Sequence, residues 1–499
     1  MRLPRIYLKP TVSAISRLTL ILIVLILAAG IGTYVAYQLA GSNTLTTSVS
    51  STTSSSTSAS VTGTISSIYS STTSAITQTE DNGSLWLVYH RDQTRDGYDP
   101  TEKATNNISL SWKTPHLDGD VYAEPLIAEG KIFIATENDS VYALNESTGS
   151  IEWKTELGLP VPGSALPCGD IDPSGITSTP VIDLETNSIY VVAFLKPIEH
   201  FLFGISLTNG FVNLNRSVDP ISSNFDASVQ QQRGALALSG GIVYIPYGGL
   251  DGDCGQYHGW LVGVTLNGSG SLMTYMDPTS REGGIWATSG PAIDSSGNIL
   301  VTTGNSEATS SFDFGDAVIK LSPTLQELDY FAPTDWASLN SGDVDLGSVG
   351  PSILGSNTIF QIGKEGVGYL LSDSNLGQIG GEIFNATVCG SAFGGNAYSA
   401  PYLYVPCTDG LVALNVSLGS SKSFSTVWED SGTAYPPIVA GGAVWSVIGG
   451  SLEVLNPVNG STIFSYRLSK AVHFITPSSA DGHVVIAAGS EILSFAIVG

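Results

Sequence analysis

The sequence has few basic residues and few cysteines. Its 499 residues contain 19 Lys+Arg against 44 Asp+Glu, so the formal net charge is -25. A nucleic-acid-binding protein needs a basic face against the phosphates, so this class is excluded. The four cysteines form no CxxC or CxxCH motif. Their spacing therefore argues against a cysteine-based zinc or redox centre and against a covalently attached c-type haem.

The chain also lacks the short motifs of several enzyme classes. We find no Walker loop, no Rossmann fingerprint and no nucleophile elbow with Ser, His and Asp. The glycines of GKEGVGYL (363–370) are typical of turns rather than of a phosphate-binding loop. Glycine and aromatic residues are abundant, with 56 Gly, 20 Tyr and 8 Trp. This composition favours many short strands joined by tight turns over helices.

The N-terminal 40 residues predict a membrane anchor. Residues 18–40 carry no charge, and as a helix they extend about 34 Å, enough to cross a hydrocarbon core of about 30 Å. Residues 1–17 contain basic and no acidic residues, so they should stay in the cytoplasm and the C-terminal bulk should lie outside the cell. The alternative is a cleaved signal peptide. The apolar run is long for one, and Gln38 stands where a small residue is expected before a cut at Ala40.

The next segment predicts a stalk. Residues 41–80 are almost entirely Ser, Thr, Ala, Val and Ile, a composition that cannot bury a core and suits a disordered, O-glycosylated spacer. N-x-S/T sequons follow on the predicted outer side, as expected for a glycoprotein. They lie at Asn82, Asn107, Asn138, Asn145, Asn215, Asn267, Asn385, Asn415 and Asn459. Outside the cell, disulfides are expected: Cys389–Cys407 on neighbouring strands and, by elimination, Cys168–Cys254.

Residues 81–499 repeat one pattern. VYALNESTGSIEWKTEL (141–157) is an alternating strand, a turn at Thr148-Gly149 and a strand centred on Trp153. Related units recur, each after a Pro- or Gly-led strand pair, and four strands every 35–50 residues or so are typical of propeller blades. Full units begin near 124, 178, 234, 289, 350, 390 and 435. An eighth unit ends the chain after three strands, and residues 108–115 should supply its fourth.

The sequence therefore predicts an all-β protein, an eight-bladed β-propeller of four-stranded antiparallel blades, preceded by a transmembrane helix and the stalk. A pair of β-sandwiches and a seven-bladed ring are the alternatives. The repeat resembles that of the pyrroloquinoline-quinone (PQQ) propeller superfamily, and LWLVYHRDQTRDGYDP (85–100) resembles the N-terminal segment of its secreted members. That superfamily contains quinoprotein alcohol dehydrogenases and also non-enzymatic propellers, so the resemblance implies the fold more than an activity.

Three segments resemble the cofactor site of the dehydrogenases. In EGGIWATSGPAID (282–294), Trp286 matches the tryptophan that stacks on the flat quinone. In TTGNSEAT (302–309), Asn305 matches the asparagine that binds calcium. In IGKEGVGYLLSDSNLG (362–377), Lys364 matches the cation over the quinone oxygens. The resemblance thus implies PQQ and Ca²⁺, with an aromatic face, oxygen ligands and a fixed positive charge.

The loop GGLDGDCGQYHGWLVG (248–263) falls where the family supplies an acidic calcium ligand. Asp251 or Asp253 could take that role, although neither aligns cleanly. The alternative is a plain turn tied down by Cys254, since glycine-rich acidic loops are common turns. His258 is either a ligand or base, or a packing residue beside Trp260.

The sequence departs from the dehydrogenases in two respects. Their catalytic aspartate would fall near Lys320 and Leu321, with Asp316 only at the start of that strand, and oxidation of an alcohol needs a base. Their disulfide between adjacent cysteines is also absent. The acidic insertion 331–354, which contains Asp335, Asp343 and Asp345, is interpreted as a structured surface loop rather than a cap or a cation site.

The sequence leaves the question of enzymatic activity open. The interpretation we favour is a membrane-anchored extracellular PQQ-like propeller that acts as a binding or scaffolding module at the cell surface, with protein or glycan partners. The alternative is a PQQ- and calcium-dependent dehydrogenase of alcohols or sugars. A rigid head on a glycoprotein stalk is a third possibility.

Overall fold

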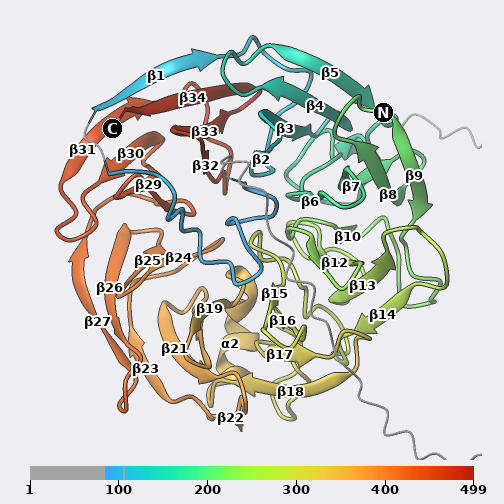
Figure 1. Ribbon diagram of the computed structural model, residues 1–499. Coiled ribbons are helices and arrows are strands. Elements are labelled where there is room, and N and C mark those ends of the chain that lie inside the picture. Colours follow the sequence, from blue (N-terminus) through green and yellow to red (C-terminus); the bar gives the residue numbers. More distant parts are fainter. Residues whose placement is uncertain (1–84, 105–106, 499) are drawn as a thin grey trace, which may run out of the picture. The chain divides into compact units, whose positions relative to one another are not determined.

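The computed structural model describes residues 85–104 and 107–498, which form eight antiparallel blades in a closed ring (Figure 1). The predicted eight-bladed propeller is confirmed. The predicted tail, anchor and stalk (1–80) lie outside the described residues. Within the part of the chain that is described, no helix is long and apolar enough to span a membrane.

Each blade is a sheet whose strands run outward from the ring axis in chain order, except that β1 (Asn107–Lys113) is the outermost strand of the eighth blade and β22 (Gln378–Ile379) adds a parallel edge to the fourth. The first four blades are β2 (Leu126–Ala128), β3 (Lys131–Thr136), β4 (Ser140–Asn145), β5 (Ile151–Glu156); β6 (Val181–Asp183), β7 (Ser188–Leu195), β8 (Glu199–Ser206), β9 (Val212–Ser217); β10 (Gln230–Gln231), β11 (Ala237–Ser239), β12 (Ile242–Gly249), β13 (Trp260–Thr265), β14 (Met273–Met276); and β15 (Ala292–Ile293), β16 (Ile299–Thr302), β17 (Val318–Leu321), β18 (Glu327–Ala332) with β22.

The last four blades follow the same plan. They are β19 (Ser352–Gly355), β20 (Thr358–Gln361), β21 (Val367–Ser372), β23 (Phe384–Thr387); β24 (Ala397–Ser399), β25 (Tyr402–Pro406), β26 (Leu411–Ser417), β27 (Ser423–Glu429); β28 (Ile438–Ala440), β29 (Ala443–Ile448), β30 (Ser451–Leu455), β31 (Thr462–Arg467); and β32 (Ser478–Ala480), β33 (His483–Ala488), β34 (Glu491–Val498). The short helices are η1 (Gly163–Ala165), α2 (Trp336–Gly342) and η2 (Leu346–Ser348).

The ring closes through β1, which pairs antiparallel with β34, from Asn107 opposite Val498 to Lys113 opposite Leu493. The strand predicted upstream of the repeats therefore completes the eighth blade. Closure covers the edge of β34, which would otherwise expose unpaired backbone groups. The two ends of the propeller are thus joined in a single sheet.

The recurring Gly and Trp of the repeat lock neighbouring blades together. The Nε1 of Trp112 donates a hydrogen bond to the carbonyl oxygen of Glu146 in the next blade, at 2.9 Å. Gly149 has φ +69°, and a Cβ there would lie 2.4 Å from the Trp112 ring. Trp153 makes the same contact with Gly210 one blade further on. Only glycine allows both this backbone conformation and the close approach of the indole.

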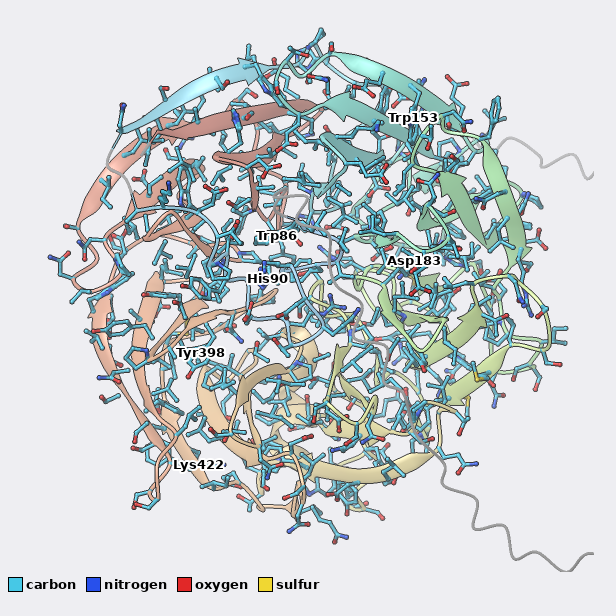
Figure 2. All side chains as sticks on the ribbon, in the orientation of Figure 1. Trp86, His90, Trp153, Asp183, Tyr398 and Lys422 are labelled. Atoms are coloured by element: carbon cyan, nitrogen blue, oxygen red, sulfur yellow. A yellow bond between two sulfur atoms is a disulfide. The ribbon has the colours of Figure 1, made fainter. Side chains whose placement is uncertain are left out.

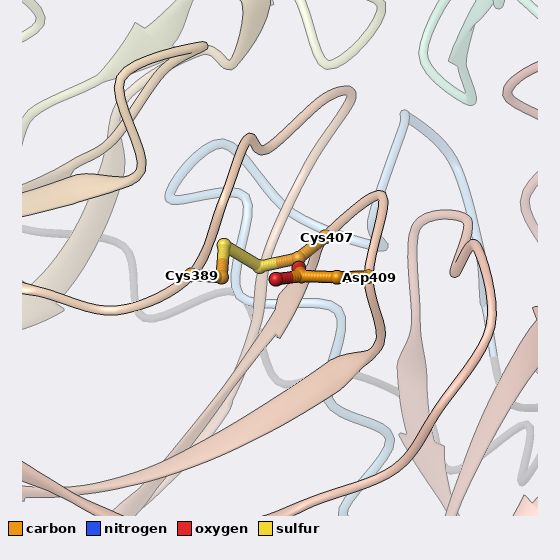
Figure 3. Close-up of side chains that lie close together, drawn as sticks. All are labelled: Cys389, Cys407 and Asp409. Atoms are coloured by element: carbon orange, nitrogen blue, oxygen red, sulfur yellow. A yellow bond between two sulfur atoms is a disulfide. The ribbon is translucent and has the colours of Figure 1, made fainter.

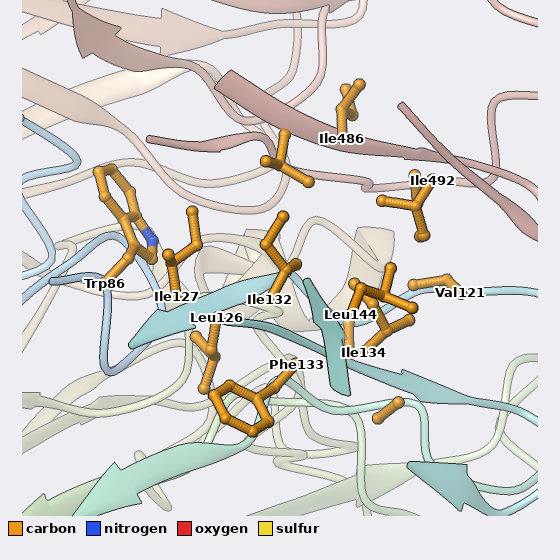
Figure 4. Close-up of a cluster of buried hydrophobic side chains, with 14 of the residues drawn as sticks. Trp86, Val121, Leu126, Ile127, Ile132, Phe133, Ile134, Leu144, Ile486 and Ile492 are labelled. Atoms are coloured by element: carbon orange, nitrogen blue, oxygen red, sulfur yellow. The ribbon is translucent and has the colours of Figure 1, made fainter. Parts of the chain in front are cut away.

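Burial follows the position of each strand in its blade. In β3, all residues except Lys131 are buried, because an inner strand is covered by blades on both faces, whereas the outer strand β5 alternates between exposed and half-buried residues. The largest apolar cluster joins the first, second, seventh and eighth blades, and in Figure 4 Trp86 lies next to Ile127 within it. Figure 2 shows Trp86 and His90 near the middle of the ring and Lys422 at its rim.

The segment 85–100 closes the middle of the ring. Trp86 pairs with Ile127 of the first blade and Tyr98 with Val439 of the seventh, so the segment crosses from one to the other. Arg95 is buried, and its guanidinium donates to three carbonyl oxygens. These acceptors belong to Tyr89, Leu236 and Pro291, at 2.9, 3.0 and 2.9 Å. The segment that resembles secreted PQQ propellers therefore forms part of the axial core.

Both predicted disulfides are confirmed. Cys168 is bonded to Cys254, 86 residues later, and Cys389 to Cys407, 18 residues later. The first joins the connection between the first two blades to a loop of the third blade. The second joins Cys389, which follows β23, to Cys407, which directly follows β25 (Figure 3).

Candidate functional site

A cavity of about 490 Å³ lies where the connections between blades meet. A second, much smaller cavity of about 10 Å³ shares three lining residues with it, Arg233, His473 and Phe474. Tyr89 of the axial segment also lines this small cavity. The axial segment therefore closes the narrow end of the larger cavity, which we call the central cavity.

The central cavity collects every site residue that the sequence singled out for cofactor or metal binding. These residues are Asp251, Asp253, Trp286, Asn305 and Lys364. They come from blades three, four and five, which are far apart in the sequence. Their convergence follows from the ring, which brings the inner ends of all blades to one axis.

Aromatic rings form one wall of the central cavity. The Lys364 Nζ lies 5.8 Å from the centroid of the Trp286 ring, a cation–π contact. Phe393 lies 6.3 Å from Trp286 and stacks on Phe474 at 5.5 Å. Trp286 is only half-buried, so its indole presents an apolar flat face to a ligand.

Asp345 brings a buried carboxylate next to this wall. It lies between α2 and η2, within the insertion that we interpreted as a surface loop, and only 4% of it is exposed. Its Oδ1 accepts the backbone N–H of Asn305 at 2.8 Å. Its Oδ2 forms an ion pair with Lys364. The surface-loop interpretation is therefore wrong for this residue, because the insertion folds back into the axis.

Lys364 holds two aspartates at once. Its Nζ also pairs with Asp343 at 2.8 Å. Burial raises the pKa of Asp345, and the ammonium of Lys364 opposes this rise. For Lys364 itself, burial lowers the pKa, but Asp345 and Asp343 together hold it above its usual value. The positive charge predicted to face a quinone is thus engaged by protein carboxylates.

The position expected for the catalytic aspartate lies elsewhere. Lys320 pairs with Asp294 and Asp373, at 2.8 and 2.7 Å, and Leu321 is a buried residue of β17. Asp316 is buried behind the cavity wall, where it accepts the backbone N–H of Leu346 at 2.8 Å. Asp345 is instead a buried carboxylate of this part of the chain that lines the cavity. It was missed because it belongs to an insertion outside the repeat.

The glycine-rich loop 248–263 combines both roles that the sequence left open. Its Asp251 and Asp253 line the central cavity, and its Cys254 is held by Cys168. The Asp253 Oδ1 accepts the hydroxyl of Tyr257 at 2.6 Å. His258 is buried and is not among the residues that line the cavity, and burial lowers its pKa. The structure thus favours packing for His258.

A carboxylate cage for a metal ion is not found at the cavity. Among residues 85–104 and 107–498, the only group of three close Cys, His, Asp or Glu ligands is Cys389, Cys407 and Asp409 (Figure 3). The two sulfurs of that group are bonded to each other, so they cannot ligate a metal. At the cavity, the Asn305 Nδ2 donates to Glu282 at 3.2 Å.

The comparisons with known proteins agree with the fold. Residues 106–193 match a PQQ-repeat family model described as outer membrane protein assembly factor BamB. The chain has the fold of the PQQ-repeat β-propellers. No curated protein matches the sequence. The resemblance noted in the repeats is therefore confirmed at the level of the superfamily.

Three solved structures show the range of proteins that share this propeller. A quinohemoprotein alcohol dehydrogenase from Pseudomonas putida matches with a TM-score of 0.65 and 13% identity, covering 83% of this chain and 80% of its own. A europium-containing methanol dehydrogenase has a TM-score of 0.64 and 13% identity, covering 84% and 98%. BamB from Moraxella catarrhalis has a TM-score of 0.54 and 13% identity, covering 78% and 100%. At these identities, the likeness is one of fold.

PQQ with calcium, which the resemblance implies, fits the shape of the site better than its charge. Trp286 offers a flat face, and Asn305 lies beside it. The cavity is, however, lined by five aspartates, Asp170, Asp251, Asp253, Asp343 and Asp345, against the cations of Arg233 and Lys364 and one histidine. Because Asp343 and Asp345 already pair with Lys364, the cation that the resemblance places over the quinone oxygens is not free to contact them. The residues present do not match this cofactor.

Proposed function

We propose that the chain is a binding propeller whose central cavity takes a polyhydroxylated ligand of sugar size. The observation that carries this proposal is the joint position of the half-buried Trp286 and a set of carboxylate and amide oxygens in a cavity of about 490 Å³. Cavities of roughly 300–1,000 Å³ are typical of small-molecule sites.

The chemistry of the lining favours hydroxyl groups. Hydroxyl groups donate hydrogen bonds to carboxylates without adding charge, and such charge-assisted bonds are strong. The apolar C–H face of a sugar ring packs well on an indole, while its polar edge meets Asp251 and Asn305. A sugar therefore satisfies the aromatic wall and the acidic wall together.

The proposal is tested by calorimetric titration of the full-length protein with mono- and disaccharides. Trp286→Ala should lower the affinity of the best ligand by roughly 10-fold or more, because one large stacking surface is lost. Phe211→Ala is the matched control, since Phe211 is 73% exposed and does not line the cavity. If no sugar binds, or if Trp286→Ala binds like the wild type, the proposal fails.

A quinoprotein dehydrogenase is the second candidate, and one observation favours it. Asp345 supplies the carboxylate beside Trp286 that an alcohol-oxidising site needs. Addition of PQQ and Ca²⁺ to the full-length protein distinguishes the two functions. Saturable PQQ binding that is lost in Trp286→Ala and in Asn305→Ala, with alcohol oxidation by an artificial electron acceptor, would establish the dehydrogenase instead.

We also propose that the propeller faces the cell exterior. This proposal is supported by the uncharged run 18–40, by the basic residues before it and by the Ser/Thr-rich stretch 41–80. The disulfides are in keeping with an oxidising compartment. Protease added to intact cells should then release the propeller, and a fragment with the basic tail should remain in the membrane fraction. Protection of the propeller from protease would contradict this orientation.

A further inference from the structure

Arg233 is a half-buried cation, two of whose guanidinium nitrogens have no hydrogen-bond partner. It precedes β11 and lines both the central cavity and the small cavity beneath it. Its Nε and Nη2 are buried, and neither atom has a hydrogen-bond partner. Burial lowers the pKa of Arg233, while Asp170, Tyr122 and Asp251 oppose this effect from a distance. The desolvation cost of this guanidinium is therefore offset only in part, by carboxylates that make no hydrogen bond to its Nε and Nη2.

The two atoms without partners form one recognition edge. The Nε–H and Nη2–H of a guanidinium point in parallel, and together they fit the two oxygens of a carboxylate or another oxyanion. The Phe474 ring packs 5.1 Å from the Arg233 guanidinium carbon and limits its movement. The Thr288 hydroxyl also lines the small cavity, beside Tyr89. The unmatched donors of Arg233 thus adjoin this narrow space.

The other cations of the cavity, His473 and Lys364, already contact carboxylates. His473 lies 3.2 Å from the Asp170 carboxylate, and this hydrogen bond, helped by Arg233, lowers the pKa of Asp170. Lys364 is held by Asp343 and Asp345. Arg233 is therefore the cation of the cavity that remains available for an anionic group.

Arg95, another arginine near the axis, shows that a guanidinium in this region need not lack hydrogen-bond partners. Arg95 also lies near the axis, but its Nε, Nη1 and Nη2 all donate to backbone carbonyl oxygens. Its role in joining the axial segment to the blades is complete within the protein. All three guanidinium nitrogens of Arg95 have acceptors within the protein, whereas two of those of Arg233 have none. Arg95 is therefore structural, and Arg233 is the one with donors left for a ligand.

We propose that Arg233 is the oxyanion receptor of the central cavity, so that its ligand is a sugar bearing a carboxylate, phosphate or sulfate group. This inference rests on the proposed sugar-binding function and narrows its ligand class. The ring of the ligand stacks on Trp286, and its oxyanion takes the guanidinium of Arg233. Both residues line one cavity, so a single ligand of disaccharide size or smaller reaches both.

The test compares glucuronate, glucose 6-phosphate, glucose 6-sulfate and glucose by calorimetric titration of the full-length protein. Wild type should bind at least one anionic sugar roughly 10- to 100-fold more tightly than glucose, the range expected for a charge-assisted pair. Arg233→Met should remove this preference, so that glucose and the anionic sugars bind with similar affinities. Arg233→Lys should restore only part of it, because an ammonium lacks the parallel edge. The sugar bound most tightly identifies the oxyanion.

Melting without ligand separates recognition from a structural role. Arg233→Met should melt no lower than the wild type, because it removes a buried charge that has no partner. A marked fall in melting temperature would overturn the inference. Equal binding of glucose and all anionic sugars would also overturn it, while the sugar-binding function would stand. If no sugar binds, but inorganic phosphate raises the melting temperature of the wild type and not of Arg233→Met, the function fails and the oxyanion site stands.

Discussion

Glu137 should make the propeller less stable as the pH rises, and Glu137→Gln should remove that loss. Glu137 lies in the turn between β3 and β4 and is 2% exposed. Its Oε2 accepts the backbone N–H of Gly175 at 2.7 Å, and its Oε1 is buried without a hydrogen-bond partner. Burial raises the pKa of Glu137 to about 7, although the bond from Gly175 acts in the opposite direction. A glutamine keeps the carbonyl acceptor for Gly175 and carries no charge.

The direction and the size of this change in stability follow from the linkage between protonation of Glu137 and folding. The pKa of Glu137 is about 7 in the folded chain against 4.5 for an ordinary glutamate, so between these limits the folded state holds a proton that the unfolded state releases. Stability is therefore full below about pH 4.5 and is lost as the pH rises through about 7. The loss is about 3 kcal/mol. For roughly 400 ordered residues, this corresponds to about 4 °C in melting temperature.

Thermal melting of the wild type and Glu137→Gln between pH 4 and pH 8 checks this reasoning. The variant should melt about 4 °C above the wild type at pH 8 and close to it at pH 4. Glu129→Gln, at the exposed turn between β2 and β3, is the control and should show no pH-dependent difference. Equal effects of Glu137→Gln at both pH values would refute the argument, because a packing change does not depend on protonation.

Two further predictions concern the ring itself. In the chain-entropy model, loss of the disulfide Cys168–Cys254 should cost about 5 kcal/mol and loss of Cys389–Cys407 about 3 kcal/mol, because the closed segments differ in length. Melting of the two Cys→Ser pairs checks this order, and the reverse order would show that native-state packing dominates. Trp112→Phe loses the indole hydrogen bond to the next blade, at about 1 kcal/mol. Hydrogen exchange should then quicken in β1 and β34, and unchanged exchange there would contradict the locking role.

The ring could be predicted from the sequence because its repeat has physical causes. Gly149 and Gly210 recur since each must admit an indole from the preceding outer strand at a positive φ. The strand predicted at 108–115 was recognisable by its tryptophan, Trp112, which makes the same contact. Unit spacing then fixed the number of blades, and the incomplete last unit required closure by an upstream strand.

The site could be predicted only in part. Trp286, Asn305 and Lys364 stand at repeat positions, so their resemblance to a known site also placed them near the axis. Asp345 stands in an insertion without strand periodicity, and its acidic neighbours suggested a surface. One signal could have revealed that the insertion returns to the core: the small and apolar residues 346–350 directly follow Asp345, and they are buried throughout. Arg233 belongs to no motif, and its unmatched donors become visible only once the blades are assembled.

The two axial arginines show why the ring alone does not explain the site. Arg95 could be fully bonded because the axial segment brings its guanidinium against three carbonyl oxygens. Arg233 lies at the inner start of a blade, where the neighbouring backbone is already paired in strands and Asp170 is held by His473. A methionine of similar length would fill that place without the cost of a buried charge. The cationic side chain is therefore best explained by what it binds, and the ring supplies only its position.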